Sequence, residues 1–365
     1  MRRTRFVKLW LLIAAALLNV AATPPLLVSG TTPQWRLYPS QVRQVALLGQ
    51  RPRITAQAAL LVDVDSQTIL YEREARRRLP QASTTKIMTA VIALEQGKLD
   101  ERVTVPMDLQ VDGSLMGLRP GETLTLADLL YGLLLPSGND AALVIAQHVG
   151  GSVEAFVAAM NAKAQALGLT DTHFENPHGH DSPNHYSSAR DLWLLASYAL
   201  RNPVFAKIVA TRAATIAGRE LVNRNELLGS YPGADGVKTG TTDLAGECLV
   251  ASVQRDGHRV MAVILGSQDR YADVRALLDY YFANYGWLAL QLPRNAFSRV
   301  RDGQGQVYDL RLVGEREAFL PRWEWPFVRS IIMLVPERGA TPAGVARFWA
   351  GPTVLDEVPV RGELP

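Results

Sequence analysis

The stretch Leu79-Pro80-Gln81-Ala82-Ser83-Thr84-Thr85-Lys86 places a serine three residues before a lysine, where apolar residues at helical spacing begin. This spacing predicts a helix that starts near Ser83, with the Ser83 hydroxyl and the Lys86 ammonium on one face within a turn. A serine hydroxyl becomes a good nucleophile when a base removes its proton, and a lysine held near other cations can supply a neutral amine. Taken alone, the residues also fit a helix-capping serine beside a solvated lysine.

A second motif, Ser137-Gly138-Asn139, lies 51 residues after Lys86, in a break between two apolar segments that predict helices. The serine hydroxyl could relay a proton to a leaving amine, and the asparagine amide could hold a substrate carbonyl and the lysine. In isolation, the same three residues are also typical of a plain turn whose asparagine caps the next helix.

A third motif, Lys238-Thr239-Gly240-Thr241, follows a loop rich in glycine and proline and precedes two predicted strands. On a strand that borders a cleft, the lysine supplies positive potential and the threonine supplies a hydroxyl for a substrate carboxylate. The glycine lets an extended substrate backbone come close. The alternative for this tetrapeptide alone is a solvated lysine at a strand edge.

Together, in this order and spacing, the three motifs are the signature of β-lactamases and penicillin-binding proteins. The surrounding residues, Leu79–Ala90, Leu135–Ala142 and Asp235–Thr242, closely resemble those of the serine D-alanyl-D-alanine carboxypeptidases, which are the low-molecular-mass penicillin-binding proteins. The resemblance runs from about Ala58 to Tyr285. It implies removal of the terminal D-alanine from peptidoglycan stem peptides through an acyl-enzyme, without a cofactor and with β-lactam antibiotics as acylating inhibitors.

The resemblance also implies roles for individual residues. Ser83 would be the acylated nucleophile and Lys86 its base, while Ser137 and Asn139 would relay protons and position the substrate. Two departures stand out against the family pattern. The sequence ends at Pro365 without the amphipathic helix that many members use at the membrane, and a histidine, His180, follows Gly179 where the family has an apolar residue.

The third motif is implied to bind the substrate. Lys238 and Thr239 would hold its C-terminal carboxylate, and Gly240 would let the substrate backbone approach. The backbone N–H groups of Ser83 and Thr241 would form the oxyanion hole.

The element pattern predicts an α+β catalytic domain, with helices packed on an antiparallel sheet built from both ends of the domain's chain. Strands are expected at 58–64 and 67–71, and again at 248–254 and 258–266 around the turn Arg255-Asp256-Gly257. Helices are expected at 126–135, 140–148, 152–167, 189–200 and 273–285. We predict a leader over 1–22, a linker over 23–55, the catalytic domain over 56–288 and a small β-rich domain over 289–365.

The charge and the cysteine content further narrow the class of protein. Four basic and no acidic residues lie in the first 22, so the rest of the chain holds 34 basic against 35 acidic residues. A nucleic-acid-binding protein would keep a basic body, so that class is excluded. The single cysteine, Cys248, excludes an internal disulfide and a four-cysteine zinc site.

The chain begins with basic residues and an apolar run, Leu9–Leu18, followed by the small residues of Val20-Ala21-Ala22. This order predicts a secretory signal peptide, with an uncleaved membrane anchor as the alternative. Either interpretation places the body of the protein outside the cytoplasm, in the periplasm or beyond it. Any membrane association would then come through this segment only.

A zinc peptidase is an alternative mechanism, because His173, His178, His180 and His185 fall within 13 residues together with Asp181. No His-Glu-x-x-His pair accompanies them, so solvated loop histidines are the favoured interpretation and no metal is expected.

Three other functions share the motifs. A β-lactamase needs a deacylating carboxylate, and Glu175-Asn176 lacks the Glu-x-x-x-Asn spacing of that class. A DD-endopeptidase would use the same centre on cross-linked peptides. A non-catalytic peptidoglycan-binding protein would have lost a motif residue, and none is missing.

Overall fold

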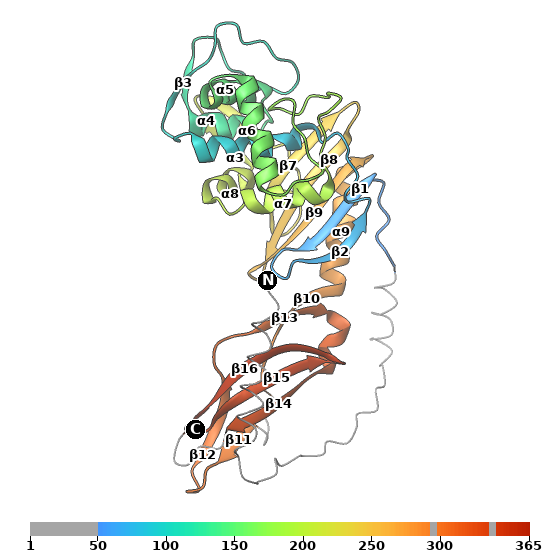
Figure 1. Cartoon of the computed structure of the whole chain (residues 1–365), viewed down its shortest axis with the longest axis vertical. Helices are drawn as coiled ribbons and strands as arrows, with labels where there is room; N and C mark the ends of the chain where they lie inside the picture. Colours follow the sequence, from blue (N-terminus) through green and yellow to red (C-terminus); the bar gives the residue numbers. More distant parts are fainter. Residues whose placement is uncertain (1–49, 293–297, 336–340) are drawn as a thin grey trace, which may run out of the picture. The chain divides into compact units, whose positions relative to one another are not determined.

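The computed structural model describes residues 50–292, 298–335 and 341–365, and the expected leader and most of the expected linker lie outside them. The predicted α+β fold is confirmed: helices pack on an antiparallel sheet of order β2-β1-β9-β8-β7 (Figure 1). Its strands are β1 (Ala58–Asp63), β2 (Thr68–Arg73), β7 (Ala234–Thr242), β8 (Gly246–Arg255) and β9 (His258–Ser267). The sheet therefore joins the first and last strands of the catalytic segment, as expected.

The helical part lies between β2 and β7 in sequence. It begins with a short 3-10 turn, η1 (Ala82–Thr85), and it carries two small hairpins, β3–β4 and β5–β6. The helices and remaining strands are α3 (Lys86–Gln96), β3 (Arg102–Thr104), β4 (Thr123–Thr125), α4 (Leu126–Leu134), α5 (Asn139–Gly150), α6 (Val153–Ala166), α7 (Ala189–Ala199), α8 (Pro203–Ala210), β5 (Ala213–Ile216), β6 (Arg219–Val222) and α9 (Arg270–Asn284).

The central sheet is buried on both faces, because its strands send alternate side chains to opposite sides. Leu61, Ala251 and Ile264 belong to the core that α9 covers. Leu60, Val250 and Val263 belong to the larger core that contains α3 to α7. The sheet is thus the middle layer between α9 and the helices that carry the first two motifs.

The local sequence explains where most of the helices and turns begin. Thr125 and Asp128 form a capping box at α4, Ser188 caps α7, and Asp269 caps α9 through two backbone N–H groups. Asp256 and Gly257 both have positive φ, which is the two-residue turn that matches the twist of the β8–β9 hairpin.

Two expectations change. The α-helix after Ser83 begins at Lys86, because residues 82–85 form a 3-10 turn that Ala82 enters with a φ of +48°. Helix α8 was not expected, although Asn202 caps it and Pro203 occupies its first turn.

The C-terminal part is all β. Strand β10 (Tyr285–Ala289) pairs with β13 (Glu317–Pro321), and a five-stranded sheet has the order β11-β12-β16-β15-β14. The elements are β11 (Arg299–Arg301), β12 (Val307–Leu312), η3 (Arg322–Phe327), β14 (Val328–Val335), β15 (Ala343–Ala350) and β16 (Thr353–Glu363). The domain boundaries given above remain predictions.

Among the described residues, no helix by itself has the length and apolar character needed to cross a bilayer. Only α5 and α6 taken together reach that threshold, with a bend of 86° between them.

A buried carboxylate joins the entry to β1 with α9. Asp273 accepts hydrogen bonds from the Thr55 and Ala56 N–H groups at 2.8 Å each and from Ser267 Oγ at 2.6 Å. We expect Asp273→Ala to lower the free energy of unfolding by about 3 kcal/mol, because it leaves buried donors without an acceptor. Urea denaturation measures this, with the exposed Glu220→Ala as control. A loss below about 1 kcal/mol would contradict the prediction.

Candidate active site

The structure brings Ser83 and Lys86 together at the junction of η1 and α3. Lys86 Nζ lies 2.8 Å from Ser83 Oγ, at hydrogen-bond distance. The two residues meet through the 3-10 turn rather than through the α-helical turn that the spacing suggested. Ser83 stays partly accessible, whereas the Lys86 side chain is fully buried.

Lys86 also contacts two oxygens from distant parts of the chain. Its Nζ lies 2.7 Å from Asn139 Oδ1 and 2.7 Å from the His178 carbonyl oxygen. Burial lowers the pKa of Lys86 well below its ordinary value, and the nearby cations Lys238 and Arg224 lower it further. A neutral amine here would donate to the two oxygens and turn its lone pair toward the Ser83 hydroxyl. The arrangement therefore suits a general base.

The second motif lies in the break between α4 and α5. Asn139 is the first residue of α5, and its Nδ2 donates to the Asp112 carbonyl at 2.6 Å, so its Oδ1 faces Lys86. Ser137 has a φ of +68°, and its Oγ is buried without a hydrogen-bond partner among the described residues. A strained residue with an unpaired buried hydroxyl is a common mark of a functional site.

The third motif lies on β7, an edge strand of the described sheet. A Cβ atom at Gly240 would stand 3.0 Å from Ser83 N, Gln81 O and Ala82 Cβ, so only glycine allows this approach between β7 and η1. The backbone N–H groups of Ser83 and Thr241 are the predicted oxyanion hole. Thr241 directly follows Gly240, the residue at which β7 comes close to Ser83 N. The edge of β7 therefore runs beside Ser83, the predicted nucleophile.

Lys238 and Thr239 are both buried on this strand. Burial lowers the pKa of Lys238 to about 7, with Arg224 and Arg270 adding to the effect. The one hydrogen bond that its Nζ makes within the described residues goes to the Thr239 carbonyl at 3.1 Å. Three cations thus stand near one another, an arrangement that an anionic ligand would stabilise.

Two of these cations, Arg270 and Arg224, are not identified by any of the three motifs. Arg270 begins α9, donates to the Gly240 carbonyl at 2.9 Å and to Thr241 Oγ1, and pairs with Glu247 at 3.0 Å. It therefore fixes the strand that carries the third motif. No spacing in the sequence relates Arg270 to that motif.

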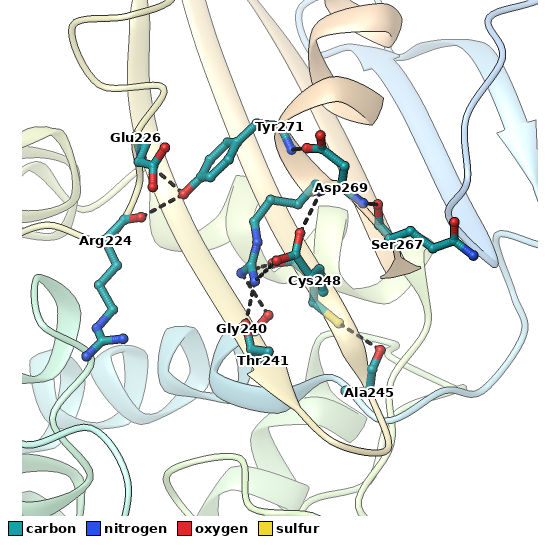
Figure 2. Close-up of polar contacts among 12 residues, drawn as sticks. Arg224, Glu226, Gly240, Thr241, Ala245, Cys248, Ser267, Asp269 and Tyr271 are labelled. Carbon is teal, nitrogen blue, oxygen red and sulfur yellow. Dashed lines mark hydrogen bonds and ion pairs between the residues drawn. The ribbon is translucent and has the colours of Figure 1, made fainter.

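Arg224 is held from two sides. Its Nε donates to the Pro136 carbonyl at 2.9 Å, next to Ser137, and its own carbonyl accepts from Tyr271 Oη at 2.8 Å. Figure 2 shows the Tyr271 hydroxyl in contact with both Arg224 and Glu226. The Glu226 N–H donates to this hydroxyl. Arg224 thereby links the Ser137 break to the start of α9.

The four clustered histidines have separate surroundings. Within the described residues no three His, Cys, Asp or Glu side chains converge on a position where a metal could be held. His173 Nδ1 bonds the Asn184 carbonyl, whereas the rings of His178 and His180 meet edge to face at 4.6 Å. Burial lowers the pKa of His178 to about 3.

The departure His180 keeps its side chain exposed and places Nε2 3.4 Å from Asn139 Nδ2. It therefore meets the second motif instead of filling an apolar core position. Glu175, the carboxylate considered for a β-lactamase, accepts from Ser182 Oγ and from the Asn184 N–H at 3.1 Å. Through these hydrogen bonds, Glu175 stabilises the loop.

A partly accessible serine beside a buried lysine, an asparagine after a helix break and a lysine–threonine–glycine edge strand define a serine hydrolase of the penicillin-binding-protein type. The family model "D-alanyl-D-alanine carboxypeptidase" (Peptidase S11) matches residues 46–269. The chain belongs to this family of serine-type carboxypeptidases.

Relatives and solved structures agree with that assignment. The chain is 37% identical over 265 residues to the D-alanyl-D-alanine carboxypeptidase DacF of Bacillus subtilis, covering 69% of this chain and 68% of that protein. It is 39% identical over 241 residues to DacB2 of Mycobacterium tuberculosis, covering 62% and 82%. The crystal structure of penicillin-binding protein 5 from Haemophilus influenzae aligns with a TM-score of 0.67 at 29% identity, covering 86% of this chain and 98% of that one.

The close approach at Gly240 gives a test of the site geometry. We expect Gly240→Ala to slow acylation by benzylpenicillin about tenfold or more, because the new Cβ would push β7 away from the Ser83 N–H. Stopped-flow acylation measures this. The control is Gly303→Ala, where no atom lies within 4 Å of the added Cβ. Equal acylation rates in the two variants would show that the approach is not needed.

Proposed function

We propose that this protein removes the terminal D-alanine from peptidoglycan stem peptides through an acyl-enzyme on Ser83. Family membership makes it a serine-type D-alanyl-D-alanine carboxypeptidase. The observation that carries the residue assignment is the buried Lys86 amine, 2.8 Å from Ser83 Oγ and 2.7 Å from Asn139 Oδ1.

Acylation begins with proton transfer from the Ser83 hydroxyl to the neutral Lys86 amine. The serine oxygen attacks the carbonyl carbon between the two D-alanines, and the backbone N–H groups of Ser83 and Thr241 stabilise the oxyanion. The amide nitrogen must receive a proton before the C–N bond breaks. The unpaired hydroxyl of Ser137 can pass this proton from Lys86, and the departing group is free D-alanine.

Binding at the edge of β7 orients the substrate. The stem peptide adds as an extended strand beside Gly240, while Lys238 and Thr239 hold its terminal carboxylate. The carboxylate brings a negative charge to Lys238, whose neighbours Arg224 and Arg270 are cationic. Its arrival favours the charged form of Lys238, whose pKa of about 7 reflects burial and neighbouring cations.

Deacylation completes the cycle. Water attacks the Ser83 ester and gives a proton to Lys86. Lys86 passes this proton to the Ser83 oxygen as the ester bond breaks, which regenerates the serine hydroxyl and releases the shortened peptide with its new carboxylate. A β-lactam acylates the same serine, but its leaving nitrogen stays attached to the opened ring. The protein therefore binds penicillins as slowly released covalent inhibitors.

The place of action follows from the substrate. Peptidoglycan lies outside the cytoplasmic membrane, and relatives with this activity come from bacteria such as Bacillus subtilis and Escherichia coli. We therefore place the protein in the bacterial cell envelope, exported through residues 1–22. Residues 56–288 would form the catalytic domain, and residues 289–365 an accessory β domain.

Loss of the nucleophile tests the central assignment. We expect Ser83→Ala to abolish fluorescent-penicillin labelling and to reduce D-alanine release about a thousandfold or more. Lys86→Ala should lose a comparable factor, since the two residues act as one unit. The exposed Lys207→Ala serves as control. Covalent labelling that survives in the Ser83 variant would assign the nucleophile elsewhere.

Substrate pairs test the carboxylate site. The wild-type enzyme should prefer a peptide ending in D-Ala-D-Ala over the same peptide ending in D-alaninamide, by about 10- to 100-fold. This range corresponds to a hydrogen bond to a charged group. In Lys238→Ala the two kcat/KM values should nearly converge, which a double-mutant cycle measures. A preference that persists undiminished would remove Lys238 as the carboxylate site.

A further inference from the structure

The histidine-rich loop, residues 172–187, folds back against the turn that carries the nucleophile. Its ends meet through the bridge between His173 and Tyr186, and Ser187 bridges to Leu79, just before η1. Ser187 and Leu79 exchange backbone hydrogen bonds at 2.9 and 3.0 Å. The loop is therefore anchored to the chain segment that leads into Ser83.

The middle of this loop contributes directly to the proposed base. The His178 carbonyl lies 2.7 Å from Lys86 Nζ, and the neighbouring Pro177 carbonyl accepts from Thr89 Oγ1 on α3 at 2.5 Å. Two successive carbonyls thus rest on α3. A displacement of the loop would remove one of the oxygens that hold the Lys86 amine.

His185 is the buried side chain that connects this loop with η1. The ring is 3% exposed, and its Nδ1 accepts from the Glu175 N–H at 2.9 Å. The neutral ring must then carry its proton on Nε2, which donates to Thr85 Oγ1 at 2.7 Å. Gln81 Nε2 reaches the same hydroxyl at 3.1 Å. Each ring nitrogen therefore has a hydrogen-bond partner, Nδ1 in the loop and Nε2 in η1.

Burial, more than the charged groups around it, favours the neutral ring of His185. Burial lowers the pKa of His185 to about 4, the charge of His173 adds to this, and Glu175 and Asp181 oppose it. The ring of Phe174 packs edge-on against it at 5.8 Å. A neutral imidazole, with one acceptor and one donor, is what the two contacts require.

We propose that His185 is a positioning residue for the carboxypeptidase reaction, clamping the loop to the nucleophile turn so that the His178 carbonyl stays on Lys86. This inference rests on the proposed function, because it assumes that Lys86 is the base. The clamp acts through geometry alone: His185 touches neither substrate nor reacting atoms. It gives one histidine of the cluster a role that needs no metal.

The clamp has a consequence for the base itself. Burial is the largest cause of the low pKa of Lys86. If the loop moves away, water reaches the amine, and its pKa rises toward the ordinary value. The lysine is then protonated at a pH where the wild-type residue is neutral and able to accept the serine proton.

The test compares His185→Leu and His185→Gln with a matched control, His173→Leu. His173 lies in the same loop but is only partly buried, and its ring bonds within the loop, to the Asn184 carbonyl. The readouts are kcat and KM for a peptide ending in D-Ala-D-Ala, the acylation rate with benzylpenicillin, and the pH profile of kcat/KM. All rates are referred to the folded fraction, measured by thermal unfolding.

We expect His185→Leu to lower kcat and the acylation rate about 10- to 100-fold, with KM changed less than threefold. The acid limb of its kcat/KM profile should move to higher pH by at least half a unit, since that limb reports the base of the free enzyme. His185→Gln keeps a donor toward Thr85 and should be intermediate. His173→Leu should match the wild type.

A different outcome in the His185 variants would contradict the proposal. If the folded His185 variants keep the wild-type kcat and acid limb and lose only thermal stability, the residue is structural and the proposal is wrong. If the leucine variant does not fold, the glutamine variant decides by the same two readouts. Failure of the proposed function would look different, because the wild-type enzyme itself would then release no D-alanine.

Discussion

The buried amine of Lys86 is the constraint on which the catalytic centre depends. A lysine removed from water is costly unless it is neutral or fully hydrogen-bonded. Here the side chain is met by three oxygens, from Ser83, Asn139 and His178, at 2.7–2.8 Å. These oxygens come from three separate segments of the chain. Holding the lysine in a state from which it can accept a proton therefore requires that all three segments be in place.

The central sheet makes that convergence rigid. Its strands alternate side chains between the α9 core and the α3–α7 core, so η1 and β7 are both supported by packed layers. At their contact, Gly240 removes the side chain that would otherwise separate the strand from Ser83. Arg270 then fixes the same strand from α9 through the Gly240 carbonyl. The proposed substrate edge and the proposed nucleophile are consequently positioned by the same packing.

Charge is distributed unevenly around this centre. Lys238 lies near Arg224 and Arg270, and both arginines disfavour its charged form. In the protein without ligand this repulsion is unfavourable, and the packing of the surrounding hydrophobic cores offsets it. In the proposed mechanism a terminal carboxylate relieves it, and an amide does not. On that proposal, the same repulsion favours a substrate with a free C-terminus.

Local sequence was enough to predict much of the fold and the three motifs. Capping residues such as Ser188 and the Asp256-Gly257 turn act within a few positions, so their structural effect is visible in the sequence. The motifs are recognisable because their chemistry needs particular side chains at short spacing. Even the departure His180 was visible, although its contact with Asn139 was not.

What only the tertiary structure decided comes from contacts between distant segments. Arg270 lies some thirty residues beyond Gly240, and the His178 carbonyl reaches Lys86 from 92 positions away. A backbone carbonyl carries no side-chain signature, and an arginine at the start of a helix resembles any other. The 3-10 turn at Ser83 likewise follows from the fit of η1 against β7, not from helix propensity. Sequence alone therefore determined which groups are predicted to do the chemistry. The packed sheet and loop decided how these groups are held together, because desolvation and hydrogen-bond geometry exist only once the chain has folded.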